Sequence, residues 1–250
     1  MSLNKSDVAL IASFTDFGPT GPYHGQMDAV LASQAPNTPR VTLMTDAPMF
    51  DAQAAGLLLS SLSDFMPPNT LFLAVVDPGV GGGRRPLILK TERNIFVGPD
   101  NGLLVPIVRR GNDIEIVTIE WQPERLSESF HGRDLFAPVA ATLANGEAVK
   151  VSPLKIEEMT GFTSPLERNR IIYIDHFGNA VTGVKAEDVE DGTIITIHGK
   201  ALRYARTFSE VPVGESFWYR NSMGLVEFAV NCGSVASLLD LELGMPLELY

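Results

Sequence analysis

The stretch Leu71–Val76, with the sequence LFLAVV, decides the fold class of this chain. It is a continuous apolar run, and turn-forming residues bound it at both ends, including Pro68 before it and Pro78 after it. A short run of this kind is typical of a central strand that is buried on both faces of a sheet. We therefore expect Leu71–Val76 to lie in the middle of a covered sheet.

The segments around this run alternate between strand and helix patterns. Short apolar runs predict strands over residues 8–14, 41–45, 87–91 and 95–97. Helices are predicted over residues 25–33, 51–62 and 134–145, the last with Pro138 near its first turn, where proline is tolerated. This alternation predicts an α/β domain whose central sheet is mainly parallel.

The pattern changes after Gly146. Pro153, Pro165 and a turn-forming cluster at Gly161–Ser164 interrupt it, and the segments beyond Arg170 are short and β-like. We expect an N-terminal α/β domain over residues 1–155, a linker over residues 156–167 and a smaller C-terminal domain over residues 168–250. Strands predicted over residues 171–175, 193–197, 216–219 and 226–230 make the second domain an antiparallel β domain.

The composition argues against several classes of partner. The chain has 30 acidic and 19 basic residues, a formal net charge of −11 at pH 7, so neither nucleic acid nor an anionic membrane is an expected partner. Its apolar runs are too short to span a bilayer. Four histidines without paired spacing give no reason to expect a metal site.

The single cysteine, Cys232, excludes an internal disulfide and favours a reducing compartment, so we expect a cytoplasmic protein. Its neighbours Asn231 and Gly233 offer nothing that would activate a thiolate. We interpret Cys232 as a small buried residue.

The first candidate for chemistry is Asp77–Arg84, with the sequence DPGVGGGR. It lacks the Gly-Lys-Ser/Thr ending of a phosphate-binding loop, and Arg84 stands where a dinucleotide fingerprint needs its third glycine. A loop with this many glycines can fold back and bring the Asp77 carboxylate against the Arg84 guanidinium. A strand-end turn with a capping aspartate remains the structural alternative.

The second candidate is Phe130–Asp134, with the sequence FHGRD. His131 lies in a loop just before a predicted helix and can titrate near neutral pH, although a lone histidine is more often structural. We interpret Asp134 as the N-cap of that helix.

Asp16, like Asp77, follows a predicted strand, and ligands of α/β sheets bind at the carboxyl ends of strands. The two oxygens of Asp16 suit the vicinal hydroxyls of a ribose, although a turn cap is an equal alternative. In the second domain, the turns Asp175–Asn179 and Asn221–Gly224 offer carboxylate, hydroxyl and amide groups that suit a zwitterion. Whether these two turns converge does not follow from the sequence.

Seven short motifs occur in an order that is more specific than any of them alone. They are TDFG (Thr15–Gly18), YHGQM (Tyr23–Met27), DPGVG (Asp77–Gly81), GPDNG (Gly98–Gly102), FHGRDLFAP (Phe130–Pro138), DHFGN (Asp175–Asn179) and NSMGLVEFAVNCGS (Asn221–Ser234). Together they resemble the S-adenosyl-L-methionine hydroxide adenosyltransferase family, relatives of the fluorinase and chlorinase. The resemblance covers nearly the whole chain.

The resemblance implies a reaction in which water or hydroxide attacks the ribose 5′ carbon of S-adenosyl-L-methionine and releases adenosine and L-methionine. It implies a β-barrel-like second domain, a homotrimer with sites between subunits, and no cofactor. Its water-activating trio falls on Asp77, Arg84 and His131. The substrate-binding positions that it implies are Asp16 for the ribose, Asp175 and Ser222 for the methionine end, and Asn179, Phe208, Tyr219 and Cys232 for the adenine.

Two other functions stay open at this stage. A halide-dependent adenosyltransferase is the first, but Asp77 occupies the loop where a halide pocket should exclude a carboxylate. Met223, where the fluorinase has an arginine, also fits the hydroxide branch. A non-catalytic S-adenosylmethionine or adenosine binding protein is the second, and it would need none of the trio.

Overall fold

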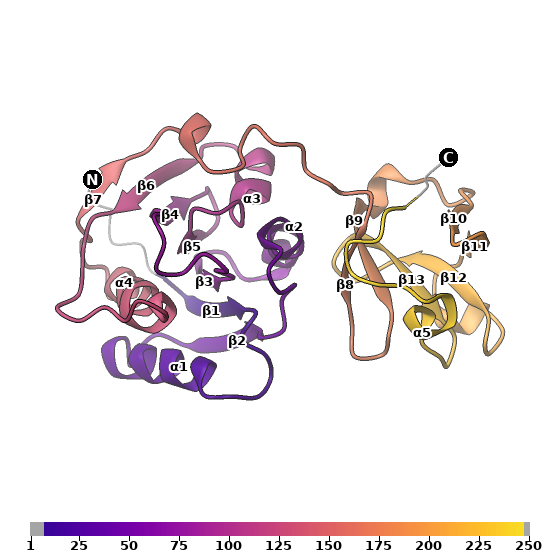
Figure 1. The fold of residues 1–250 in the computed structure, drawn as a ribbon, viewed down its shortest axis with the longest axis horizontal. Helices are drawn as coiled ribbons and strands as arrows, with labels where there is room; N and C mark the ends of the chain where they lie inside the picture. Colours follow the sequence, from indigo (N-terminus) through magenta and orange to yellow (C-terminus); the bar gives the residue numbers. More distant parts are fainter. Residues whose placement is uncertain (1–7, 248–250) are drawn as a thin grey trace. The chain divides into compact units, whose positions relative to one another are not determined.

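The computed structural model describes residues 8–247, which divide into two compact domains (Figure 1). The main boundary lies between Ser164 and Pro165, and residues Ser60–Phe65 group with the second domain. The main boundary falls inside the linker expected over residues 156–167, and the bounds of that linker stay a prediction. Each domain is described by itself.

A mixed sheet of seven strands forms the centre of the first domain in the part of the chain that is described, in the order β2-β1-β3-β5-β4-β6-β7. The strands are β1 (Leu10–Thr15), β2 (Arg40–Met44), β3 (Thr70–Val75), β4 (Pro86–Lys90), β5 (Ile95–Pro99), β6 (Glu115–Ile119) and β7 (Val151–Pro153). The pairs among β2, β1, β3 and β5 are parallel, and the pairs that add β4, β6 and β7 are antiparallel. The parallel part is therefore centred on β1 and β3.

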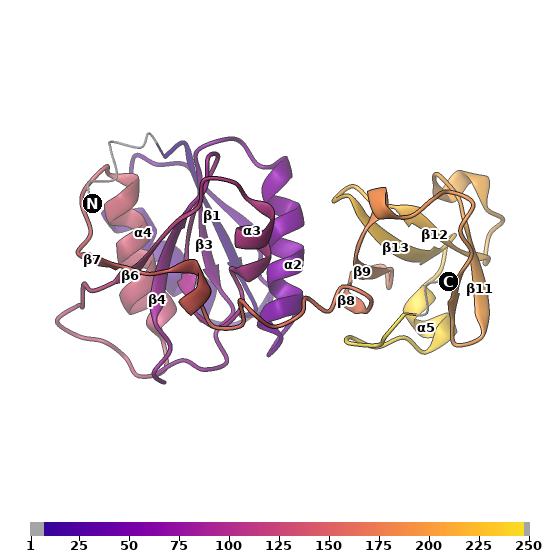
Figure 2. The same ribbon diagram turned by 90° about the horizontal axis from the view of Figure 1, so that it is seen from above.

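Helices cover both faces of this sheet, as Figures 1 and 2 show together. The helices α1 (Tyr23–Gln34) and α4 (Ala137–Ala144) lie on one face, and α2 (Ala52–Leu62) and α3 (Val105–Arg110) lie on the other. Met27 and Leu31, one turn apart on α1, are its buried residues. The start of α2 is capped by Asp51, whose carboxylate accepts a hydrogen bond from the Ala54 N–H at 2.9 Å.

The strand β3 is buried at all six positions, as LFLAVV predicted. Leu71, Leu73 and Val75 belong to the core shared with α1 and α4. On the opposite face Phe72 stacks on Phe96 of β5 with 4.7 Å between ring centroids. Because each buried side chain of this size contributes about 1.5–3 kcal/mol, this strand fixes the centre of the domain.

The second domain is a six-stranded sheet, within the described residues, that curls into a half-barrel (Figure 2). Its order is β10-β11-β12-β13-β9-β8, and every pair is antiparallel except β11 with β12. The strands are β8 (Ile171–Ile174), β9 (Ala180–Lys185), β10 (Ile195–Ile197), β11 (Lys200–Tyr204), β12 (Ser216–Arg220) and β13 (Leu225–Val230), and the helix is α5 (Val235–Leu239). Trp218 and Phe228 are fully buried in its core.

The predicted fold class is confirmed: an α/β domain is followed by a smaller β domain. The predicted strands and helices lie within about two residues of the observed ones, as is usual at element ends. The sequence patterns missed β6, β7, β9, β11, α3 and α5. They also missed that the helix predicted over residues 134–145 begins with a π-helical turn at Gly132–Phe136.

Candidate active site

The loop after β3 folds back on itself and forms an ion pair between Asp77 and Arg84. The Arg84 Nε donates to Asp77 Oδ1 and Oδ2 at 3.0 and 2.9 Å, and Nη2 donates to Oδ2 at 2.5 Å. Both side chains are nearly buried, at 5% exposed for Asp77 and 10% for Arg84. A fork-shaped contact of this kind fixes the orientation of a carboxylate as well as its charge.

His131 contacts the same guanidinium. Its Nδ1 lies 2.7 Å from Arg84 Nη2, and the residue is buried. Since a guanidinium has donors and no acceptor, Nδ1 accepts this hydrogen bond and the ring proton is on Nε2. Burial and the charge of Arg84 lower the pKa of His131 below its ordinary value, against the opposing charges of Asp77 and Asp134. The imidazole is therefore neutral at neutral pH.

The π-helical turn that follows His131 corrects the role predicted for Asp134. The residue that precedes this turn is His131, so Asp134 lies inside the turn and is not its N-cap. The Asp134 carboxylate instead accepts hydrogen bonds from the Arg133 side chain and from the Ser127 N–H. It thereby holds the segment that leads into Phe130 and His131.

Asp16 lies at the same edge of the sheet as Asp77. It directly follows β1, which pairs with β3 in register from Leu10 with Thr70 to Thr15 with Val75. Burial raises the pKa of Asp16 above its ordinary value, and the charge of Asp77 adds to this rise. The structure therefore brings Asp16, Asp77, Arg84 and His131 together at the carboxyl ends of two adjacent strands.

Three aromatic rings pack together beside these residues. Phe17, Tyr23 and Phe130 contact one another with ring centroids 5.4 to 6.0 Å apart. Phe17 follows Asp16 and Phe130 precedes His131, so the packing of the rings fixes the chain on both sides of the polar cluster. Tyr23 is half exposed.

A separate hollow of about 710 Å³ lies in the second domain. Five of the predicted binding residues line it: Asp175, Asn179, Phe208, Tyr219 and Cys232. The Asp175 carboxylate accepts hydrogen bonds from Asn179 Nδ2 and from the N–H groups of Phe177 and Asn179. The Oδ1 atom of Asn179 is buried and has no hydrogen-bond partner among the described residues.

One prediction for this domain differs from the structure, and the role of Ser222 stays a prediction. Cys232 is exposed and not buried, because it sits with φ of +59° in the turn after β13. Ser222 is exposed in the turn between β12 and β13 and is not among the residues that line the hollow.

Glu227 on β13 is a residue that the sequence analysis missed. It is 4% exposed, and its two oxygens accept hydrogen bonds from Tyr219 Oη at 2.5 Å and from Asn221 Nδ2 at 2.7 Å. Burial raises the pKa of Glu227 despite these bonds. The sequence could have indicated this residue, because Glu227 is the one charged residue within the otherwise apolar segment LVEFAV.

Sequence models of two domains match this chain over most of its length. The SAM hydroxide adenosyltransferase N-terminal domain matches residues 11–152, and the C-terminal domain of the same family matches residues 169–248. The chain belongs to the SAM hydroxide adenosyltransferase family.

Similar proteins of this family and fold span the whole chain. An (R)-S-adenosyl-L-methionine hydrolase from Thermus thermophilus is 36% identical, and the match covers 94% of this chain and 97% of the relative. A second protein of that name, from Salinispora arenicola, is 35% identical over 95% of this chain and 96% of the relative. A solved structure of an uncharacterised conserved protein from Thermotoga maritima is 29% identical, with a TM-score of 0.79, and covers 95% of this chain and 98% of that one.

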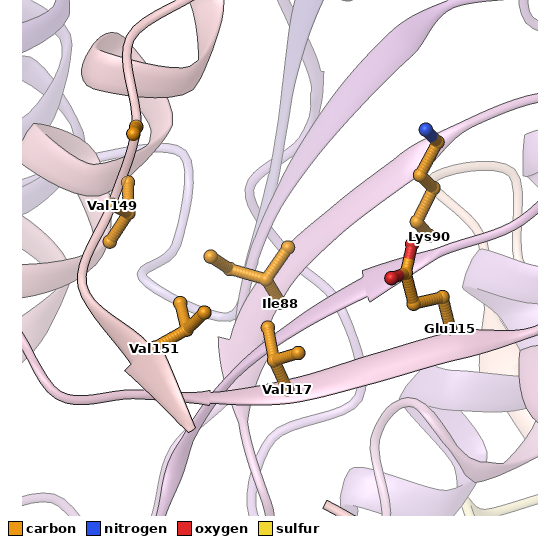
Figure 3. Close-up of a pocket in the computed structure, with 7 residues that line it drawn as sticks. Ile88, Lys90, Glu115, Val117, Val149 and Val151 are labelled. Atoms are coloured by element: carbon orange, nitrogen blue, oxygen red, sulfur yellow. The ribbon is translucent and has the colours of Figure 1, made fainter. Parts of the chain in front are cut away.

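The first domain of this SAM hydroxide adenosyltransferase family member contains another hollow. This hollow is too small to bind a substrate-sized ligand. Ile88, Val117, Val149 and Val151 point toward one another around a space of about 10 Å³ between β4, β6 and the start of β7 (Figure 3). That space holds about one water molecule. Among residues 8–247 there is no cluster of histidine, cysteine and carboxylate side chains that could hold a metal, and no helix long and apolar enough to cross a membrane.

Proposed function

We propose that this chain hydrolyses S-adenosyl-L-methionine to adenosine and L-methionine. The observation that carries the proposal is the Asp77–Arg84–His131 arrangement, in which one guanidinium contacts both a carboxylate and a neutral imidazole. Family membership supports the same reaction, because relatives at 35 and 36% identity are named (R)-S-adenosyl-L-methionine hydrolase.

The reaction needs an activated nucleophile and in-line geometry more than it needs an acid. The oxygen of water bonds to the ribose 5′ carbon while the C–S bond breaks, and the electron pair of that bond stays on sulfur. Since the sulfonium leaves as a neutral thioether, no proton has to be supplied to methionine. One proton of the water has to be removed, and a positioned base contributes about 10²–10⁴-fold to such a step.

The hydrogen bonds give each residue of the trio a different role in the reaction. His131 Nδ1 accepts from Arg84, so its Nε2–H is left to donate to the attacking water and orient it. Asp77 is then the group that accepts the proton. Arg84 holds the carboxylate and the imidazole in fixed geometry.

The substrate is cationic at its sulfonium, and both groups of predicted binding residues carry negative charge. Asp16, beside Asp77, is suited to the two ribose hydroxyls. Asp175 is suited to the ammonium group, Ser222 to the carboxylate, and Phe208, Tyr219 and Cys232 to the adenine. The unpartnered Asn179 Oδ1 is an acceptor for a base N–H.

The remaining parts of the proposal concern the assembly. We infer a homotrimer in which the trio of one subunit and the hollow of its neighbour hold one substrate molecule. We also infer a cytoplasmic enzyme that needs no cofactor, since neither proton removal nor departure of a neutral thioether requires one.

The test of the reaction is incubation with S-adenosyl-L-methionine in ¹⁸O-labelled water, with and without chloride. Adenosine that carries the label at its 5′ hydroxyl is the expected product in both arms. A halogenated nucleoside as the main product would instead indicate a halide-dependent adenosyltransferase, and recovery of unchanged substrate would indicate a binding protein.

The test of the trio is turnover by Asp77→Asn, with Asp28→Asn as the matched control. Asp28 also pairs with an arginine, Arg40, but is half exposed and lies in the middle of α1. We expect adenosine release to fall by about 10²–10⁴-fold in Asp77→Asn alone. Equal turnover by the two variants would remove Asp77 from the mechanism.

A further inference from the structure

Two adjacent residues at the end of β5 bind both ends of the loop that carries Asp77 and Arg84. We propose that Asp100 and Asn101 are positioning residues that fix the distance and orientation between Asp77 and Arg84. The proposal rests on the proposed function, because it gives a role in the hydrolysis to the Gly98–Gly102 segment, which that mechanism does not use.

Asn101 holds the first end of the loop. Its Nδ2 donates to the Val76 carbonyl at 2.9 Å, and Val76 is the residue immediately before Asp77. The Oδ1 of Asn101 in turn accepts from the Leu103 N–H at 3.2 Å, which fixes the side-chain amide itself. Asn101 therefore determines where the backbone leaves β3.

Asp100 holds the second end. Its Oδ2 accepts from Arg85 Nε at 2.8 Å and lies 2.6 Å from Nη2, and its own N–H donates to the Arg85 carbonyl at 2.8 Å. Arg85 is the residue immediately after Arg84. The Asp100 side chain is only 1% exposed, and its other oxygen accepts from the Thr160 N–H at 2.9 Å, so this anchor is rigid.

Close packing of the strands explains why both contacts come from one dipeptide. An added Cβ on Gly98 would lie 2.4 Å from the Ala74 carbonyl oxygen, so β3 and β5 approach more closely there than any other residue would allow. This approach brings Asp100 and Asn101 alongside the end of β3. The two ends of an eight-residue loop, Asp77–Arg84, are then set by one short rigid segment.

The chemistry makes this placement matter. Arg84 has to reach Asp77 and His131 at once, and a misplacement of about 1 Å can cost about 100-fold in rate. Asn101 acts on the backbone of Val76, and Asp100 acts on the backbone and the side chain of Arg85. Val76 and Arg85 flank the loop on its two sides.

Asn94 provides a matched control at the opposite end of the same two strands. Its Oδ1 accepts from the Thr70 N–H at 3.2 Å, so it also joins the β5 side to β3 by one side-chain-to-backbone hydrogen bond. It lies just before β5 and its side chain contacts the first residue of β3, away from the loop. Asn94→Ala removes one side-chain-to-backbone hydrogen bond between these strands, and Asn101→Ala removes one such bond together with the bond to Leu103.

The experiment compares kcat, KM and thermal midpoint for wild type, Asn101→Ala and Asn94→Ala. We expect both variants to lose thermal stability, but only Asn101→Ala to lose about 10- to 100-fold in kcat, with KM changed much less. An equal kcat in the two variants would overturn the proposal. A loss confined to KM would overturn it as well.

An NMR titration of His131 keeps the proposal testable without turnover. The charged groups that face this ring are Arg84, Asp77 and Asp134. A loosened Arg84 should let the pKa of His131 rise toward its ordinary value in Asn101→Ala and not in Asn94→Ala. If the wild type fails to hydrolyse S-adenosyl-L-methionine, the proposed function fails while this titration still decides whether Asn101 sets the geometry. Equal pKa values of His131 in Asn101→Ala and Asn94→Ala would overturn the positioning role.

Discussion

The protonation of His131 is decided by its burial and by one neighbour. Burial makes a second ring proton costly, and the charge of Arg84, which donates to Nδ1, adds to this cost, so the pKa of His131 is lowered. The unfolded chain takes up a proton on this histidine below about pH 6.5, whereas the folded chain does not until a lower pH. The free energy of unfolding should therefore fall as the pH drops through that window.

The measurement is chemical denaturation from pH 7.5 to 5 for wild type and for His131→Gln, which cannot titrate. We expect the unfolding free energy of the wild type to fall more than that of His131→Gln as the pH drops from about 6.5 to the lower pKa of the folded state. The same lowered pKa places the acid limb of kcat/KM below about pH 6.5. A constant difference across the range would contradict a lowered pKa.

A second prediction at the residue scale concerns Glu227. Its carboxylate holds both Tyr219, which lines the hollow, and Asn221, which opens the turn that contains Ser222. Glu227→Gln retains the shape but removes the carboxylate, so both hydrogen bonds lose a charged acceptor and Tyr219 has to turn its hydroxyl to keep its partner. Hydrogen bonds to a charged group contribute about 1.5–3 kcal/mol, which corresponds to an increase of about 10-fold or more in KM.

The control for this variant is Glu215→Gln, since Glu215 is exposed and lies outside the hollow. Its KM should match that of the wild type. An unchanged KM in Glu227→Gln would separate the hollow from substrate binding, and a change in kcat alone would place Glu227 with the chemical step.

At the scale of elements, the glycine-rich loop depends on one close contact. Gly81 has φ of +79°, and a Cβ added there would lie 2.4 Å from the Glu128 carbonyl oxygen. Glu128 belongs to the segment that leads into Phe130 and His131. Gly81→Ala should therefore displace the loop from this segment, with a loss of about 1–3 kcal/mol in stability and a larger relative loss of kcat.

Gly83→Ala is the matched comparison within the same loop. A Cβ at Gly83 meets no atom within 4 Å, and its φ is not positive. Thermal unfolding and turnover of both variants check the prediction, and a much smaller effect is expected for Gly83→Ala. Similar losses in both would mean that the loop tolerates displacement from Glu128.

The elements also explain how far the sequence could be interpreted. LFLAVV predicted β3 because burial on both faces leaves a continuous apolar run. The strand β6, EIVTI, was missed because its pattern is broken by charged and polar residues at a less buried part of the sheet. The ion pair of Asp77 with Arg84 could be anticipated from the intervening glycines.

Other parts of the site depend on contacts between residues far apart in the chain. The 2.7 Å contact of Arg84 with His131 spans 47 positions, and no local pattern encodes it. Cys232 is exposed because it lies in a turn, where its φ is positive. The presence of a single cysteine in the sequence does not predict such a turn. Asp134 was predicted to be an N-cap, but it lies inside the π-helical turn at Gly132–Phe136. Aspartate is common both at the N-cap and in the first turn of a helix, so the residue type does not distinguish the two positions.

At the scale of the whole molecule, each domain carries a part of the proposed site that the other lacks. The first domain carries the trio and Asp16, and the second carries the hollow with Asp175 and Asn179. If the two parts that serve one substrate come from neighbouring subunits of a ring, defects in different domains should complement each other.

The test uses Asp77→Asn and Asp175→Asn, each nearly inactive alone, co-expressed in equal amounts. In a trimer with sites between subunits, a site is intact when its first-domain side comes from an Asp175→Asn chain and its second-domain side from an Asp77→Asn chain. Random assembly makes about a quarter of the sites intact, so about a quarter of wild-type activity should return. Light scattering verifies the trimer, and co-expression of two tagged copies of Asp77→Asn controls for assembly itself. Activity that stays at the level of the single variants would place both halves of the site in one subunit.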